Sequence, residues 1–502
     1  MLDCAIQLSN GGMPILASAE AGRRSFLKYA VTAVVCGVVA GVGGFFAGSA
    51  AVPPPVTSTV TETVTKTAPG VPGATVTTTI TTTETATKTV TKVIKPTPEA
   101  PKGEPIRIGC QEDLTGFCSA FGWSKALAFE AAIKKINEEL GGIDGRPVEG
   151  YIEDTQTKSD VGAEKFRKLV LEHRCDFITS STSSGVNIAS MPLAKELKTP
   201  YFNGASMSHQ LCGGHGPDHP SFPNKGNRWF VSLQSLVSDQ VPCIAPVLYE
   251  HVAHKWATVY WDYAWGQSHD VMFSEAIEAL GGKIVAHIPV PLGTKDFLPY
   301  IAKIPKEAEA VYPVFLLSAS VGFLTQLKES GYEGELGFVI CLVDGVDCEA
   351  IADIVKGCWT LEYWPRMLKY DDTPYNRAYR KAVGKDEYGY QTYSGKRIMA
   401  TGSHSWAVWQ NVFLMKEAVE ATGWKSRKDN QKIIEYVEKV GALPWSYEYP
   451  QGPMVVRAED HHGVGRKWLS RVDEKGRIHV VEELPIEESW SKPTIDFRKM
   501  SF

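Results

Sequence analysis

The stretch EPIRIGCQEDLTG (residues 104–116) and the stretch AFGWSKALAFEAAIKKINEELGGIDGRPVEGYIED (residues 120–154) together carry the clearest structural pattern in this chain. Apolar residues at Ile106 and Ile108 predict a short strand, and a glycine-containing loop follows. The next apolar residues have the spacing of an amphipathic helix that stops at a Gly-Gly pair; they are Leu127, Phe129, Ile133, Ile136 and Leu140. With a second strand at 148–153, the pattern predicts a β-loop-α-β unit. Its loop faces the carboxyl end of the first strand, where open α/β sheets bind ligands.

The same alternation of strand and helix patterns continues through the chain. The first series has expected strands at 148–153, 176–180 and 200–203, with a helix at 160–173. The second series has expected strands at 257–262, 283–290, 310–317 and 337–342, and two more strands follow at 467–472 and 477–484. Two such series in one chain predict an α/β fold with two doubly wound parallel-sheet lobes.

The composition is that of a globular chain and indicates no special partner. Of 502 residues, 43% are apolar and 22% are charged, and the length is sufficient for two or three domains. The net charge of −5 gives no basic excess, which argues against nucleic acid binding. The sequence contains no nucleophile elbow, P-loop, HExxH or GxGxxG motif, so we expect no enzymatic activity and no cofactor.

The N-terminal part has the pattern of an export signal followed by a tether. Residues 22–28, GRRSFLK, resemble a twin-arginine (Tat) export signal at the end of a leader at 1–28. Residues 29–52 contain no charged side chain and are long enough to span a bilayer, either as a retained anchor or as a signal removed near residues 47–51. Residues 53–103 are rich in Thr, Val and Pro and predict a disordered stalk. We therefore expect an extracytoplasmic protein that is exported by Tat and anchored in the membrane.

The motifs of residues 104–154 resemble the start of the leucine/isoleucine/valine-binding family of extracytoplasmic receptors for ABC importers. The matching motifs are Leu114-Thr115-Gly116, Ala120-Phe121-Gly122, Ile136-Asn137-Glu138, Gly141-Gly142-Ile143 and Gly145-Arg146-Pro147. Residues 262–266 (DYAWG), 296–297 (DF) and 326–332 (QLKESGY) continue the resemblance. It implies a periplasmic binding protein type 1 fold, in which two lobes are joined by a three-segment hinge and close on a ligand between them.

The resemblance also implies lobe boundaries and a function. One lobe is expected at 104–228 with 365–447, and the other at 229–364 with 448–502. The implied function is that of a receptor that binds an amino acid and delivers it to an ABC transporter permease, with no enzymatic step. Two alternatives are a ligand-sensing ectodomain of the same fold and a metal-dependent enzyme.

Two serine-containing loops are candidate carboxylate-binding elements. Ser183 and Ser184 precede an expected helix, so they supply hydroxyls together with the N–H groups of a helix start, which suit a carboxylate. Ala205 and Ser206 follow the next expected strand and add another N–H group and hydroxyl. The resemblance places the carboxylate contacts of the family on these two loops. The same residues would also suit a plain helix cap and turn.

An acidic residue and two aromatic residues complete the expected site. The resemblance places the acidic partner of a ligand ammonium group at Asp344, with Asp347 as the alternative. Phe121 and Trp265 stand where the family often has Tyr, and we expect them to form apolar walls. Because both changes remove a hydroxyl, the expected ligand is a branched-chain-like amino acid, another amino acid, an amide or a small carboxylate.

The cysteine and histidine residues leave two questions open. His209, Cys212, His215 and His219 are zinc-ligand types, but their spacing is no standard metal motif, so we expect a surface insertion and keep metal binding as the alternative. Eight cysteines lie beyond the apolar run of residues 29–52. Short-range disulfides, Cys110–Cys118 and Cys348–Cys358, are one interpretation, and buried free thiols are the other.

Overall fold

The computed structural model describes residues 57–67, 75–85 and 100–502, except residues 180, 221, 341, 343 and 400–403. The chain divides into two units, Met1–Lys95 and Pro96–Phe502, and each is considered by itself. In the first unit, strands β1 (Thr57–Thr67) and β2 (Thr75–Thr85) pair antiparallel along their whole length. The prediction of a disordered stalk is therefore wrong for these two stretches. The physical reason is that Thr and Val are β-branched residues with high strand propensity.

The predicted Tat motif and the apolar run, residues 22–52, lie outside the described residues. Within the part of the chain that the structure describes, no helix combines the length and apolarity needed to cross a bilayer. The export signal and the membrane anchor stay predictions from the sequence.

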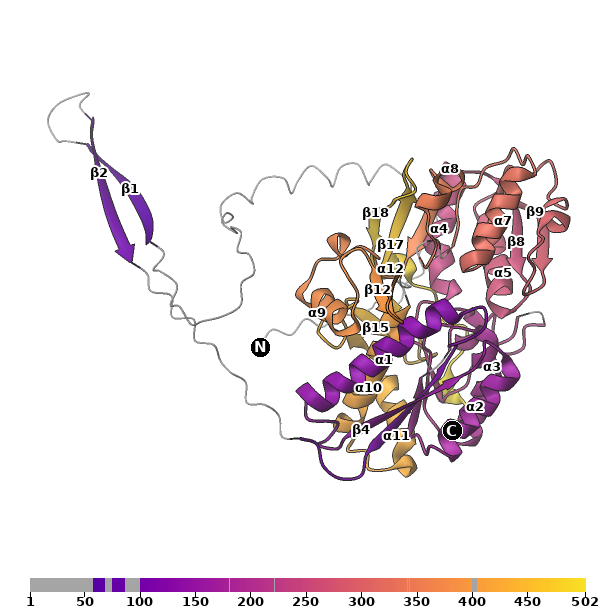
Figure 1. Cartoon of the computed structure of the whole chain (residues 1–502), viewed down its shortest axis with the longest axis horizontal. Coiled ribbons are helices and arrows are strands. Elements are labelled where there is room, and N and C mark those ends of the chain that lie inside the picture. Colours follow the sequence, from indigo (N-terminus) through magenta and orange to yellow (C-terminus); the bar gives the residue numbers. More distant parts are fainter. Residues whose placement is uncertain are drawn as a thin grey trace, which may run out of the picture. The chain divides into compact units, whose positions relative to one another are not determined.

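The second unit begins with a parallel sheet built on the opening β-loop-α-β unit. Its order is β4-β3-β5-β6-β7, with β3 (Ile106–Glu112), β4 (Val148–Asp154), β5 (Phe177–Thr179), β6 (Tyr201–Phe202) and β7 (Phe230–Val231). The helices packed around it are α1 (Ser119–Glu139), α2 (Ser159–Leu171), α3 (Ser184–Glu196), α10 (Ser405–Thr422) and α11 (Asn430–Val440) (Figure 1). The strand order reverses at β3, so α1 and α2 cover opposite faces. The predicted doubly wound parallel sheet is confirmed here.

A second sheet is partly parallel and partly antiparallel. Its parallel part has the order β10-β8-β9, with β8 (Lys255–Trp261), β9 (Lys283–Val290) and β10 (Ala310–Val314), and is accompanied by helices α4 (Val237–His251), α5 (Ala264–Ala279) and α7 (Leu317–Glu329). Single bridges, Ala310 with Glu335 and Phe338 with Trp359, lead to an antiparallel part formed by β11 (Trp359–Glu362), β17 (Lys467–Val472) and β18 (Ile478–Leu484).

The antiparallel strands correct the sequence prediction in two places. The expectation of a purely parallel second sheet is wrong for β11, β17 and β18, because a short turn joins β17 to β18 and a short turn can connect only antiparallel neighbours. Among the described residues of the strand predicted at 337–342, only Phe338 forms a bridge. The strands predicted at 467–472 and 477–484 are confirmed.

The remaining elements are short. The helices are α6 (Leu298–Ile301), α8 (Ala352–Val355), α9 (Pro374–Val383) and α12 (Ile486–Ser489), and the 3-10 helices are η1 (His209–Cys212), η2 (Glu349–Ile351), η3 (Leu368–Tyr370), η4 (Arg427–Asp429) and η5 (Phe497–Lys499). The strands are the hairpin β12 (Tyr390–Tyr393) and β13 (Lys396–Met399) and the antiparallel set β14 (Ala442–Leu443), β15 (Met454–Val456) and β16 (Gly463–Gly465). A bridge between Ser232 and His462 joins the chain that leaves β7 to the chain that enters β16.

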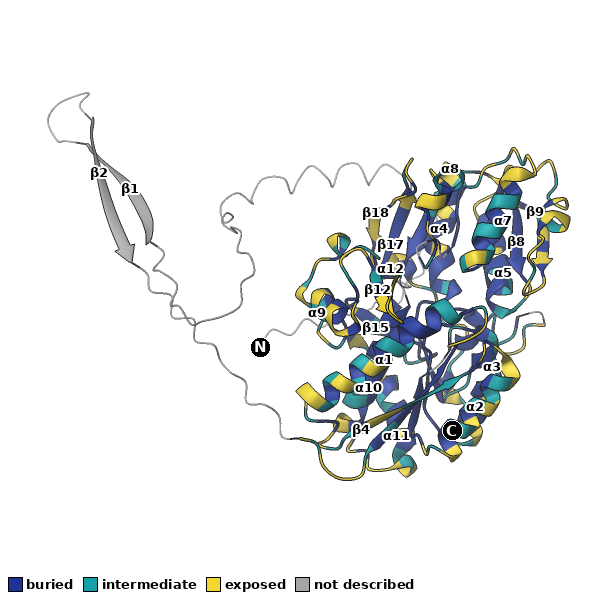
Figure 2. Cartoon of the chain, viewed as in Figure 1, coloured by how far each residue is buried: buried dark blue, intermediate teal, exposed yellow. Residues whose placement is uncertain are grey.

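The strands and the inner helix faces of the second unit are buried (Figure 2). The cysteines belong to this core. All seven that the structure describes are buried thiols: Cys110, Cys118, Cys175, Cys212, Cys243, Cys348 and Cys358. The interpretation as short-range disulfides is therefore wrong, and the alternative of buried thiols is confirmed for these residues.

Gly122 in α1 allows this helix to pack directly on the loop that follows β3. A Cβ atom at this position would lie 2.0 Å from the backbone oxygen of Asp113. We expect G122A to lower the free energy of unfolding by about 1–3 kcal/mol, because backbone atoms would have to move apart. Gly322 in α7 is the matched control, since its Cβ would make only an ordinary contact with Phe297 at 3.5 Å. G322A should raise the stability by up to about 1 kcal/mol in the same urea titration, and equal effects of the two changes would contradict the packing argument.

Candidate functional site

Asp113, at the carboxyl edge of the first sheet, ties three loops together. It follows β3, and its carboxylate accepts hydrogen bonds from the Ser181 hydroxyl at 2.8 Å, the Thr182 backbone N–H at 2.8 Å and the Thr155 hydroxyl. These partners lie in the loops after β5 and β4. The loops that sequence analysis selected as ligand-facing are thus held by one buried carboxylate. Sequence analysis missed Asp113, although its place directly after a strand was a usable signal.

A buried acid and a buried lysine lie beside Asp113. The Glu112 carboxyl is 2.8 Å from the Lys125 ammonium, and neither side chain is exposed to solvent. Lys125 comes from α1 and also donates to the Thr182 hydroxyl at 3.0 Å. Burial raises the pKa of Glu112 to about 8; the charge of Lys125 opposes this shift and the charge of Asp113 adds to it. The loop after β3 is therefore fixed by ionisable groups that are withdrawn from water.

The two predicted serine loops lie side by side. Ser183 is the N-cap residue of α3, and Ser184 is its first helical residue. The Ser206 hydroxyl donates to the carbonyls of Ser181 and Thr182, at 3.0 Å each, and the Ser208 N–H donates to the Ser184 hydroxyl at 3.3 Å. The Ser206 hydroxyl is thus used to join the loops. The N–H groups of Ser184 and Gly185 have no hydrogen-bond partner among the described residues, as expected for an open helix start.

Phe121 and Asp344 meet at a residue that sequence analysis missed, His404. The Phe121 ring lies edge-on to the His404 ring, with centroids 4.8 Å apart. An Asp344 carboxylate oxygen is 3.3 Å from His404 Nδ1, and both residues are buried. The alternative Asp347 is exposed, and its carboxylate accepts from the Ala350 N–H at 3.4 Å. Of the two candidate acids, Asp344 is therefore the one that lies among the other predicted site residues.

His404 lies at the carboxyl-end edge of the first sheet, where the serine loops also lie. This position follows from the direction of α10. Near the end of α10, Trp424 packs on Phe177 at the start of β5, with ring centroids 5.2 Å apart. Within α10, the Asn411 amide donates to Thr179 at the end of β5, at 3.1 Å. The helix therefore runs opposite to the strands. Its beginning, with His404, extends beyond their carboxyl ends.

Trp265, at the start of α5, belongs to the loops of the second sheet. Its ring packs edge-on against His269, with centroids 5.1 Å apart. The loops of the two sheets touch nearby: Phe117 lies 5.3 Å from Trp261 between ring centroids, and the Ser208 and Ser268 hydroxyls are 2.8 Å apart. All predicted ligand-facing residues are at most 4% exposed: Phe121, Ser183, Ser184, Ala205, Ser206, Trp265 and Asp344. The structure is thus a closed arrangement of these loops.

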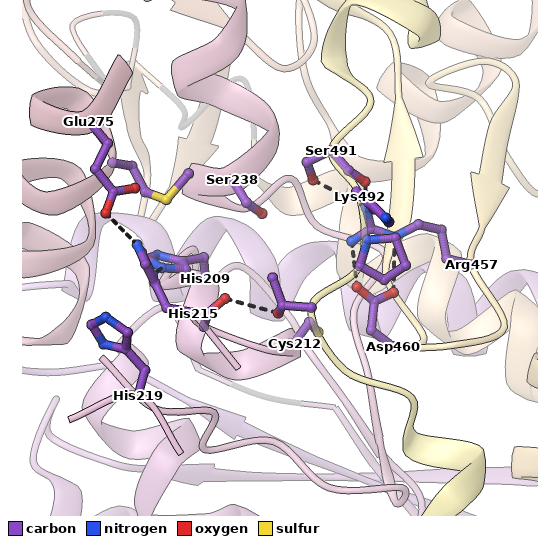
Figure 3. A pocket seen from close by; sticks show the side chains of 14 residues that line it. His209, Cys212, His215, His219, Ser238, Glu275, Arg457, Asp460, Ser491 and Lys492 are labelled. Carbon is purple, nitrogen blue, oxygen red and sulfur yellow. Dashed lines mark hydrogen bonds and ion pairs between the residues drawn. The ribbon is translucent and has the colours of Figure 1, made fainter. Parts of the chain in front are cut away.

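The histidine-rich insertion lines a separate cavity of about 310 Å³ (Figure 3). His209 and His215 share a hydrogen bond of 3.0 Å, and the other His215 nitrogen is 2.8 Å from a Glu275 carboxylate oxygen. Figure 3 shows this pair on one side of the cavity and the ion pair of Arg457 with Asp460 on the other.

The cavity gives no support to the metal hypothesis. Burial lowers the pKa of His209 to about 3, so this imidazole is neutral at physiological pH. Among the residues that the structure describes, no three His, Cys, Asp or Glu side chains are grouped so that they could hold a metal ion. The hypothesis that His209, Cys212, His215 and His219 form a metal site therefore finds no grouping of ligands here.

Comparison with known proteins gives a consistent result. A family model described as periplasmic binding protein matches residues 105–477. The Leu/Ile/Val-binding protein homolog 6 of Brucella suis is 26% identical over 238 residues, which cover 46% of this chain and 55% of that protein. The chain therefore spans about half the length of the curated relatives it matches.

Solved structures show the same fold. A periplasmic binding protein from Burkholderia mallei has a TM-score of 0.65 at 18% identity and covers 79% of this chain and 99% of its own. A solute-binding protein from R. palustris, in complex with 4-hydroxybenzoate, has a TM-score of 0.63 at 21% identity and covers 76% and 97%. LivJ from Streptococcus pneumoniae, in complex with isoleucine, has a TM-score of 0.61 at 18% identity and covers 76% and 100%.

Proposed function

The chain belongs to the periplasmic binding protein family, and we propose that it is the extracytoplasmic receptor of an ABC importer. The observation that carries this proposal is the contact between the carboxyl-end loops of the two sheets, which buries polar and aromatic residues together. Such a site can bind a small molecule and enclose it, and we propose no chemical step. The partner that receives the ligand is the ABC transporter permease.

We propose that the two sheets belong to two lobes that open and close around a hinge. The first lobe comprises 104–228 with 365–447, and the second comprises 229–364 with 448–502. The contacts Phe117–Trp261 and Ser208–Ser268 would break on opening, because their partners come from different lobes. We further propose that the leader directs Tat export and that residues 29–103 tether the receptor to the membrane.

The proposed ligand is an amino acid or an aromatic or other small carboxylate. Ser183, Ser184 and Ala205 would bind the carboxylate, supported by the unpaired N–H groups at the start of α3, and Ser206 would hold the two loops in place beside it. Phe121 and Trp265 would form the apolar walls. The solved relatives with isoleucine and with 4-hydroxybenzoate represent these two ligand classes.

A ligand screen by thermal unfolding tests the proposed function. We expect at least one compound among amino acids, amides and aromatic acids to stabilise the purified protein. At 100 times its Kd, a ligand that binds only the folded state adds about 2.7 kcal/mol to the free energy of unfolding. If none of these compounds raises the melting temperature, the chain is no receptor for them and the proposed function falls.

A further inference from the structure

A basic groove lies at the edge of the first sheet that is opposite the candidate site. Its volume is about 450 Å³, and its lining comes from the chain around the starts of β3, β4 and β5 and from the segment between α10 and α11. The lining contains six basic side chains against two acidic ones, in a chain whose net charge is −5. The basic residues of the groove are Arg107, Arg146, Arg174, Lys425, Arg427 and Lys428.

Two of the six basic side chains form ion pairs with acids that lie outside the groove lining. Arg107 is 3.0 Å from a carboxylate oxygen of Glu149, and Lys425 is 2.8 Å from a carboxylate oxygen of Asp144. These two cations are therefore compensated. The excess of positive charge lies with the other four basic side chains.

The two acidic residues of the lining do not pair with these four side chains. Asp176, directly before β5, is buried, and its carboxylate accepts the Arg107 backbone N–H at 2.9 Å. Glu104 is exposed to solvent. Within the part of the chain that the structure describes, none of the four forms an ion pair with a carboxylate; they are Arg146, Arg174, Arg427 and Lys428.

Main-chain carbonyls hold two of the guanidinium groups in place. Arg146 donates to three carbonyl oxygens at 2.7 to 3.4 Å, and its guanidinium carbon lies 5.4 Å from the centre of the Trp424 ring. Arg427 donates to the Val170 carbonyl, at the end of α2, at 3.1 Å. Carbonyl acceptors fix the orientation of a guanidinium group and leave its charge uncompensated, so the groove presents pre-oriented positive charge.

Arg174 and Lys428 are the freely available cations of the groove. Both are exposed, and neither side chain makes a hydrogen bond or an ion pair to the residues that the structure describes. Arg174 has φ = 57°, in the left-handed region that glycine and asparagine adopt most easily at the end of a helix. The turn between α2 and β5 thus presents a guanidinium at a position where glycine would be less strained.

We propose that the basic groove binds the phosphate group of an anionic molecule. Guanidinium groups form paired, charge-assisted hydrogen bonds with phosphate oxygens, and an ammonium group adds a point charge. Arg146, Arg174 and Arg427 come from three separate segments, so one phosphate in the groove meets donors from several directions. The site lies at the amino ends of the strands and is distinct from the candidate site at their carboxyl ends.

Anionic lipid head groups and free inorganic phosphate are the two sources of such a group. The position of the groove favours the lipid, because Glu104 and Pro105 line it and directly follow the stretch that the sequence predicts to be a membrane tether. Clusters of Lys and Arg close to a membrane are attracted to anionic lipids. The lipid source rests on the proposed tether, whereas the phosphate site itself does not.

Calorimetric titration of the full chain with three probes tests the phosphate site. The probes are dihexanoylphosphatidylglycerol, inorganic phosphate and dihexanoylphosphatidylcholine, with both lipids below the concentration at which they form micelles. We expect at least one of the two anions to bind with a dissociation constant below about 1 mM, and the zwitterionic phosphatidylcholine to bind at least about tenfold more weakly.

The two anionic probes distinguish the sources. Tighter binding of dihexanoylphosphatidylglycerol than of inorganic phosphate identifies the lipid head group, and equal or tighter binding of inorganic phosphate identifies free phosphate. Binding of neither anion, or equal binding of the zwitterionic lipid, would overturn the phosphate site.

The double variant R174N/K428M tests whether the anion binds in the groove. Both changed side chains are exposed, and asparagine suits the left-handed backbone at position 174, so we expect the fold to be retained. The affinity for the anion should fall at least about tenfold, because two of the four uncompensated charges are removed.

The double variant R167M/K381M is the matched control. It removes the same net charge from two exposed side chains that do not line the groove, and it should bind the anion like the unmodified protein. An unchanged affinity in R174N/K428M, or an equal loss in both double variants, would overturn the assignment of the anion to the groove. None of these results affects the proposed receptor function, because its ligand is screened separately and its site lies at the other edge of the sheet.

Discussion

Replacement of Lys467 by methionine is expected to lower the free energy of unfolding by about 3–5 kcal/mol, because it leaves a buried carboxylate without its cation. The Lys467 ammonium lies 2.9 Å from an Asp239 carboxylate oxygen, and at most 1% of either side chain is exposed. The other carboxylate oxygen of Asp239 holds the start of α4 and accepts from the Leu236 N–H at 2.6 Å and from the Ser235 hydroxyl at 3.0 Å. Asp239 cannot turn toward water without releasing this cap.

Urea titration of three variants separates the pair from its surroundings. K467M should show the predicted decrease of about 3–5 kcal/mol in the free energy of unfolding. The double variant D239N/K467M should recover part of this free energy, because the unpaired charge is gone. K499M is the control for an exposed pair: Lys499 lies 3.6 Å from Asp496 with 82% of its side chain exposed, so its loss should cost less than about 1 kcal/mol. A loss of less than about 1 kcal/mol in K467M would mean that Asp239 is solvated in the folded protein.

The parallel part of the fold could be predicted because its signals are local. In the opening unit, strand and helix periodicity and the Gly141-Gly142 stop lie within one stretch, and β3, α1 and β4 form there. The antiparallel pairing of β11 with β17 brings together residues more than 100 positions apart, such as Trp359 and Arg471. Periodicity in a single sequence contains no information on such pairing.

The candidate site also contains residues with local sequence signals and residues whose position depends on distant parts of the chain. Ser183 and Ser206 could be selected because each follows a strand at the edge where ligands bind, and Asp344 was placed by the family resemblance. His404 lies in an irregular segment, and its burial next to Asp344 depends on packing between distant parts of the chain. Selecting Asp344 as an ammonium-binding residue was reasonable from the sequence. Its contact with His404, by contrast, could not be predicted, because no local pattern marks His404.

The pH dependence of stability should reveal the state of Glu112. Its pKa is about 8 in the folded protein, above the ordinary value of 4.5, so the folded state holds a proton that the unfolded state releases between these values. The resulting stability is fully present below pH 4.5 and is lost as the pH rises through 8. Relative to E112Q, which cannot titrate, the unmodified protein should lose about 2 kcal/mol of unfolding free energy between pH 5.5 and 7.5.

The sign of the change in unfolding free energy with pH distinguishes two states of Glu112. If burial dominates, Glu112 is protonated at neutral pH and the stability falls as the pH rises. If Lys125 at 2.8 Å kept the carboxylate ionised, the folded pKa would lie below 4.5, and the stability would instead rise through the acidic range.

Urea titrations at several pH values on the unmodified protein and on E112Q measure the difference directly. E139Q changes a glutamate that pairs with Lys135 and has 62% of its side chain exposed, so it should follow the unmodified protein at every pH. Curves for E112Q and the unmodified protein that run parallel from pH 5.5 to 7.5 would show that the pKa of Glu112 is not raised in spite of its burial.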